Sequence, residues 1–185
     1  MPRILTQYRV FIGSPGGLEP ERKAFRIKLN NFNSANADEF RILFEPVCWE
    51  ETLRGAGRPQ ALIDRDLEEC DYAVFILHDR WGTPPSDENA EFTAATEEEW
   101  NLALKLYEES KMKNVTLFFK NVDDRQRNDA GPQLSKVLAF RKQIEKEKKH
   151  FFGVYDDSEH FARTLDLHLA RWLKNHLDDP GVRRP

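Results

Sequence analysis

The sequence is poor in cysteine and in uninterrupted apolar stretches. Cys48 and Cys70 are the only cysteines among 185 residues, too few for a disulfide scaffold or a cysteine-rich zinc site. No apolar run approaches the roughly 20 residues that a membrane-spanning helix needs. The first residues also lack the apolar segment of a signal peptide. These absences predict a protein of a reducing compartment, the cytoplasm, with no membrane partner.

An excess of positive charge is also missing. Lys and Arg number 28 against 32 Asp and Glu, so the net charge is -4. Proteins that bind nucleic acids generally carry a basic surplus, so no direct nucleic-acid partner is expected. The sequence contains no Walker A loop, G-x-S-x-G elbow, HExxH motif or His/Cys cluster, and no metal is expected. The 13 Phe and 4 Trp supply ample material for a packed core.

Short apolar runs alternate with longer amphipathic segments along most of the chain. Strands are predicted at residues 8–14, 40–47, 71–78, 115–120 and 151–155, and helices at 18–33, 57–70, 96–110, 132–149 and 158–177. Five strands alternating with five helices predict an α/β fold, a flavodoxin-like doubly wound parallel sheet of strand order 2-1-3-4-5. One domain, residues 1–177, is expected before a linker-like tail, residues 178–185. Ligands of such sheets bind at the carboxyl ends of the strands.

The first candidate binding segment is the turn that follows the first strand. Gly13, Ser14 and Gly16 lie in the sequence Gly-Ser-Pro-Gly-Gly. Glycines let a ligand approach the backbone, and free amides at a helix N-terminus attract phosphate or carboxylate. The alternative interpretation is a tight turn that only reverses the chain direction.

Two other segments are predicted to reach the same edge of the sheet. After the third strand, Asp79 is a candidate acceptor for ribose hydroxyls, and Trp81 a candidate for stacking on a base or nicotinamide ring. The alternative is a strand end whose tryptophan closes the core. Arg54 and Arg58 lie in a cationic loop after the second strand and are candidates for contacting a pyrophosphate. A partner surface is one alternative, and a solvated loop is slightly favoured.

A run of glutamates opens the helix that follows the third strand. A carboxylate there, desolvated by Trp81 or Trp100, would have a raised pKa and would be a candidate for catalysis. Thr96 and Glu99 also have the spacing of a capping box, in which they satisfy the first amides of the helix. Spacing alone favours the capping interpretation over catalysis.

Several short motifs, in this order and spacing, are similar to those of a known family. They are Val10-Phe11-Ile12-Gly13-Ser14-Pro15, Pro59-Gln60-x-x-Ile63-Asp64-Arg65, Arg80-Trp81-Gly82 and Thr96-Glu97-x-Glu99-Trp100-x-x-Ala103. The chain resembles the TIR-like domain-of-unknown-function family found at the N-termini of NACHT, AAA and WD-repeat proteins. That family is related to TIR domains and nucleoside deoxyribosyltransferases.

The resemblance implies chemistry at an N-glycosidic bond. Its relatives cleave or exchange such bonds with a glutamate near the start of the helix after the third strand. Glu99-x-x-x-Ala103 matches the deoxyribosyltransferase pattern, whereas the TIR order Trp-x-x-x-Glu is not cleanly present. Glu97, Glu98 and Glu99 therefore remain alternatives, with Glu99 the first choice and Trp100 a substrate-binding neighbour.

The resemblance further implies an effector or signalling domain of a prokaryotic immune protein. NAD is the expected substrate, no cofactor is expected, and activity would follow self-association or assembly with a larger oligomerising ATPase. Two alternatives stay open. One is a non-catalytic module that senses a nucleotide or binds a protein, and the other is an enzyme similar to nucleoside deoxyribosyltransferases.

Overall fold

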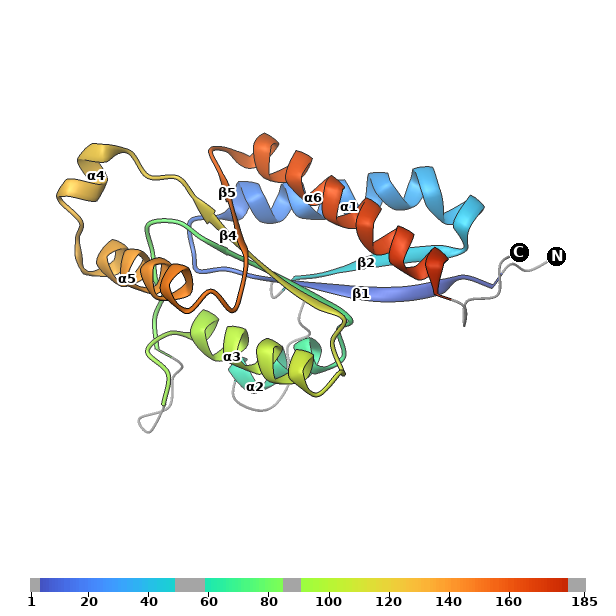
Figure 1. The fold of residues 1–185 in the computed structure, drawn as a ribbon, viewed down its shortest axis with the longest axis horizontal. Helices are drawn as coiled ribbons and strands as arrows, with labels where there is room; N and C mark the ends of the chain where they lie inside the picture. Colours follow the sequence, from blue (N-terminus) through green and yellow to red (C-terminus); the bar gives the residue numbers. More distant parts are fainter. Residues whose placement is uncertain (1–3, 49–58, 85–90, 180–185) are drawn as a thin grey trace.

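The computed structural model describes residues 4–48, 59–84 and 91–179. Its five strands form one parallel sheet of order β2-β1-β3-β4-β5 (Figure 1). The strands are β1 (Thr6–Gly13), β2 (Ile42–Cys48), β3 (Tyr72–Leu77), β4 (Asn114–Lys120) and β5 (Phe152–Tyr155). The helices are α1 (Glu19–Phe40), α2 (Pro59–Glu68), α3 (Ala95–Glu108), α4 (Asp124–Asn128), α5 (Pro132–Glu147) and α6 (Ser158–Asp178). The predicted doubly wound α/β fold and its strand order are confirmed.

The strand sequences explain why helices cover both faces of the sheet. Every residue of the central strand β3 is buried, as expected when side chains on both faces meet a helix. Alternate residues divide between two core clusters: Val74 contributes to the cluster under α1 and α6, whereas Phe75 contributes to the one under α2, α3 and α5. Figure 1 shows α1 and α6 side by side on one face and α2 and α3 on the other.

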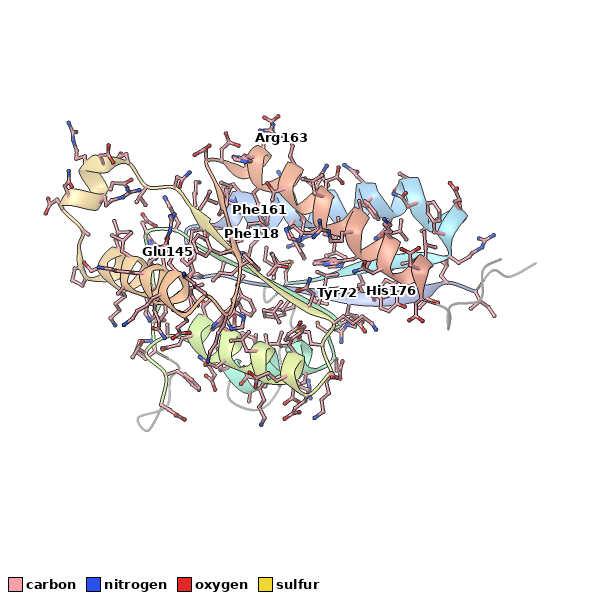
Figure 2. All side chains as sticks on the ribbon, in the orientation of Figure 1. Tyr72, Phe118, Glu145, Phe161, Arg163 and His176 are labelled. Carbon is pink, nitrogen blue, oxygen red and sulfur yellow. The ribbon has the colours of Figure 1, made fainter. Side chains whose placement is uncertain are left out.

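Aromatic side chains fix α6 against its face of the sheet. Phe118 of β4 meets Phe161 edge to face, with ring centroids 5.6 Å apart. Nearer the end of α6, the Tyr72 hydroxyl lies 2.8 Å from Nε2 of His176. Figure 2 shows both pairs between the sheet and the helix. None of the helices in the described ranges combines the length and apolarity needed to cross a bilayer.

One helix end and one loop differ from the prediction for local reasons. Helix α1 continues to Phe40 and ends where Arg41 adopts a left-handed conformation (φ 60°), because residues 34–39 contain neither glycine nor proline to stop it. The predicted loop 121–131 contains the short helix α4, so the predicted count of five helices is wrong. Asp123 and Gln126 form a capping box that starts it.

The topology brings two predicted binding segments together. Strand β1 lies between β2 and β3, and Gly13 at its end is in register with Phe75 of β3. The turn after β1 and the segment after β3 therefore meet at the carboxyl edge of the sheet, where the chain changes its winding direction. Of the predicted tail, residues 178–185, Asp178 still belongs to α6, and residues 180–185 lie outside the described residues.

Candidate active site

Glu99 lies at the carboxyl edge of the sheet, between α3 and the ends of β1 and β3. It stands in the second turn of α3 and is only 6% exposed. Its Oε2 atom is 2.9 Å from the point where a Cβ on Gly13 would stand. Gly13 and Glu99, predicted as parts of one site, are therefore direct neighbours.

The surroundings of Glu99 favour its neutral form. Burial raises its pKa to about 8, and the negative charges of Asp64 and Glu98 act in the same direction. A hydrogen bond from Gln60 opposes this shift: Nε2 of Gln60 donates to Oε1 of Glu99 at 3.2 Å. These effects together favour a protonated carboxyl group near neutral pH.

The predicted capping box of Thr96 and Glu99 is wrong. Helix α3 begins at Ala95, its N-cap residue is Ala94, and no side chain caps it there. Glu97 instead reaches back to Thr93, accepting hydrogen bonds from the amide and hydroxyl of Thr93 at 2.7 Å each. Because the helix starts earlier than the box requires, Glu99 falls in its second turn and on its buried side.

The glycine-containing turn is held from inside the protein. The buried Arg22 donates from Nη1 to Oγ of Ser14 at 2.8 Å, and its side chain is only 3% exposed. The amide of Gly17 donates to Glu19 at 3.1 Å, and Gly17 has a φ of 89° that favours glycine. These contacts favour the tight-turn interpretation for Ser14, while Gly13 keeps its place beside Glu99.

A cationic side chain lies over this turn from the outer side. Arg80 is exposed, and positions for a Cβ on Gly16 and on Gly17 are 3.9 and 3.7 Å from its nearest atoms. The sequence analysis assigned no role to Arg80. The arginines that it did select for phosphate contact, Arg54 and Arg58, lie outside the described residues.

The two tryptophans of the predicted site belong to the core. Trp81 is 7% exposed; its ring meets Phe140 at 5.2 Å, and its Nε1 donates to the Thr93 hydroxyl at 2.8 Å. Trp100 is 6% exposed and meets Phe75 edge to face at 5.4 Å. This placement favours the packing interpretation. Stacking of either indole on a ligand stays a prediction.

Asp79 is less buried than Glu99 and contacts its own neighbour in sequence. Its Oδ1 lies 3.3 Å from Nδ1 of His78, and its side chain is 42% exposed. The segment after β3 thus offers a carboxylate at the edge of the sheet. Its contact with a ribose stays a prediction.

Gln60 and Asp64 are the neighbours of Glu99 that the sequence analysis left without a role. Both lie on α2, and Nε2 of Gln60 also donates to Oδ1 of Asp64 at 3.0 Å. The signal was present in the Gln60-x-x-x-Asp64 spacing, which places two side chains on one helix face. The contact of Gln60 with Glu99, 39 residues further on, was not visible in any local pattern.

A second buried carboxylate lies at the carboxyl edge on the other face of the sheet. Glu21 of α1 is fully buried, and Lys120 at the end of β4 donates to its Oε1 at 2.8 Å. The negative charge of Glu21, after burial, contributes to raising the pKa of the Tyr155 hydroxyl. Across the described ranges, no group of three or more His, Cys, Asp or Glu side chains is placed to hold a metal ion.

Comparison with known proteins identifies a family for this chain. No curated protein matches the sequence. A solved structure of TIR domains, from the activated Roq1 resistosome directly recognizing the pathogen effector XopQ, matches with a TM-score of 0.40 and 12% identity. That match covers 93% of this chain and 98% of the other, and a likeness of this degree carries no conclusion about activity. The family described as domain of unknown function DUF4062 matches residues 9–169. The chain belongs to the DUF4062 family.

Proposed function

We propose that this domain hydrolyses NAD at the bond between nicotinamide and ribose, with Glu99 as the catalytic residue. The observation that carries the proposal is the burial of the Glu99 carboxyl group against Gly13, at the carboxyl ends of β1 and β3. Ligands of doubly wound sheets bind at this edge. A buried carboxyl group with a strongly shifted pKa at such a position is typical of an active site.

The reaction needs a negative charge more than it needs an acid. When the bond between C1′ and the nicotinamide nitrogen breaks, its electron pair goes to that nitrogen, which already carries positive charge. Nicotinamide therefore leaves as a neutral molecule without a proton donor. The ribose C1′ becomes cationic, and the carboxylate of Glu99 stabilises or traps it. Water then bonds to C1′, displaces the Glu99 carboxylate where it has bonded to C1′, and gives up one proton, so that the products are nicotinamide, ADP-ribose and a proton.

The substrate itself provides a means of ionising Glu99. With a pKa of about 8, the resting carboxyl group is mostly neutral at pH 7. A pyridinium cation brought within about 4–6 Å stabilises the charged form and lowers that pKa. Binding of NAD would thus release the Glu99 proton to water and create the carboxylate when it is needed; the proton returns from water after the products leave. At NAD concentrations well below KM, the rate should rise between pH 6 and pH 8.

The remaining roles follow the predictions made for the same edge of the sheet. The phosphates would lie near Gly16 and Arg80, which supplies positive charge over the turn, with Arg54 and Arg58 as further contacts. Ser14, Asp79, Trp81 and Trp100 complete the predicted binding set. The domain would act as an effector of a prokaryotic immune protein in antiviral defence, active after self-association or as part of a larger oligomerising ATPase.

The test incubates NAD with the full chain at high protein concentration and with crowding agents. Liquid chromatography then measures the nicotinamide that is released. Wild type should release nicotinamide, and Glu99→Gln should be at least 100-fold slower, which corresponds to about 2.7 kcal/mol at the transition state. Glu108→Gln, on the exposed end of the same helix, is the control for helix charge. The proposal fails if Glu99→Gln matches this control.

A second candidate is a non-catalytic module that binds a nucleotide or another protein. The raised pKa of Glu99 favours it, because a binding site needs no reacting anion. The hydrogen bond from Arg22 to Ser14 also favours it, because it holds the turn in place without a ligand. Calorimetry would then show NAD binding without nicotinamide release under any assembling condition. Incubation with nucleosides and free bases tests the transferase alternative in the same assay.

A further inference from the structure

We propose that Gln60 is a positioning residue for Glu99: held by Asp64, its amide fixes Oε1 as an acceptor and leaves Oε2 to face the substrate beside Gly13. This inference rests on the proposed function, because it concerns how the same carboxyl group is presented to a substrate. It gives a role to the motif Pro59-Gln60-x-x-Ile63-Asp64-Arg65, which lies on α2, whereas Glu99 lies on α3.

The geometry of the amide group carries the argument. Gln60 is 7% exposed, and its Nε2 lies 3.2 Å from Oε1 of Glu99 and 3.0 Å from Oδ1 of Asp64. A side-chain amide nitrogen has two hydrogens, and here each points at a carboxyl group. Rotating the amide by half a turn would place its oxygen against the Asp64 carboxylate. Asp64, four residues further along α2, therefore locks the nitrogen towards Glu99.

This lock determines which oxygen of Glu99 carries the proton. Oε1 accepts from Gln60, so the proton of the neutral carboxyl group resides on Oε2. Oε2 is also the atom that lies against Gly13, where a Cβ would approach it to 2.9 Å. When the proton leaves, the lone pair of Oε2 faces the end of β1. Gly13, which has no side chain, thus leaves room for Oε2, and the amide of Gln60 holds Oε1.

The charges around Glu99 show what Gln60 contributes. Asp64 from α2 and Glu98 from α3 both disfavour the anion, while β1 and β3 present the uncharged Gly13 and Phe75. Among these described neighbours, the hydrogen bond from Gln60 is the one interaction that favours the carboxylate. Loss of this donor should therefore make Glu99 harder to ionise, whereas loss of the Asp64 charge should make it easier.

The test is a pH titration of Glu99 in the full chain, followed by the NMR signal of its ¹³C-labelled carboxyl carbon. The signal is assigned by its loss in Glu99→Gln. Gln60→Met keeps the length of the side chain and removes the donor, and should raise the titration midpoint by about 0.5 pH unit or more. Asp64→Asn should lower it. Gln143→Met, which removes an exposed bond to Glu147 of 2.8 Å, is the control and should leave it unchanged.

The outcomes separate this inference from the proposed function. If NAD is cleaved, Gln60→Met should lower kcat/KM at pH 7 about threefold, because kcat/KM reports the ionisation of the free enzyme, and the loss should disappear at higher pH. One pH unit of midpoint shift changes the ionised fraction of Glu99 tenfold, so half a unit changes it about threefold. A merely structural defect would persist at every pH. An unchanged midpoint in Gln60→Met overturns the role of Gln60, even if NAD is cleaved. A shifted midpoint with no cleavage overturns the proposed reaction and retains the Gln60–Glu99 coupling.

Discussion

Oε2 of Glu99 lies 2.9 Å from the point where a β-carbon on Gly13 would stand. The same point is 2.6 Å from a ring carbon of Phe75, on the neighbouring strand. A residue with a side chain at position 13 would compete with both groups for one small space. The end of β1 must therefore be a glycine if the carboxyl group is to stay buried against the sheet.

Replacing Gly13 with alanine should accordingly destabilise the protein by about 1–3 kcal/mol, the usual cost of forcing an extra carbon into a packed site. Urea unfolding followed by circular dichroism measures the change. Gly131→Ala is the matched control, because nothing lies within 4 Å of its Cβ position, and it should change stability by less than about 0.5 kcal/mol. Equal stability of the two variants would mean that the Gly13 site has more room than the structure shows.

The fold could be predicted from local patterns because each element carries its own signal. The uninterrupted apolar run of β3 and the glycine turn after β1 are examples. The candidate site was harder to predict from the sequence. An error in the start of α3 was enough to turn Glu99 from a buried group into a predicted cap. The contacts from Gln60 and Arg22 join side chains that only the folded chain brings together, and no spacing rule connects them.

The hydrogen bonds between Glu97 and Thr93, just before α3, give a second prediction. Glu97→Ala removes the acceptor for the amide and hydroxyl of Thr93, so it should lower the free energy of unfolding by about 1 kcal/mol. Thermal unfolding measures the loss. Glu108→Ala, exposed at the other end of α3, should cost less than about 0.5 kcal/mol. If both variants melt together, the hydrogen bonds from Thr93 to Glu97 do not stabilise the start of α3.

The buried ion pair of Glu21 and Lys120, on the other face of the sheet, gives a third prediction. Lys120→Met removes the partner of Glu21, whose side chain is 1% exposed, and leaves an uncompensated buried carboxylate. The expected cost is about 3 kcal/mol. Adding Glu21→Gln should recover part of that loss, because the double variant buries no charge. Lys142→Met on the exposed side of α5 is the control for loss of a lysine. A double variant that is less stable than Lys120→Met would contradict this account.

The raised pKa of Glu99 predicts how stability depends on pH. Its ordinary value is 4.5, and its value in the folded protein is about 8. Below pH 4.5 the group is neutral in both states and contributes no difference. Between these two values the unfolded chain has released the proton while the folded chain still holds it. The folded state therefore binds more protons, and stability falls as pH rises through this window.

Glu99→Gln keeps the shape of the side chain and cannot ionise, so it should remove this slope. Relative to the variant, wild type should lose several kcal/mol, at most about 5, between pH 4.5 and pH 8, with little further change above pH 8. Urea titrations at half-unit steps of pH would measure the difference. Glu159→Gln, which removes an exposed carboxylate bound to Arg163, should run parallel to wild type. A wild-type curve parallel to that of Glu99→Gln would show that Glu99 is ionised in the folded protein near pH 5. The carboxylate would then be present before substrate arrives, and ionisation by the bound pyridinium would no longer be needed.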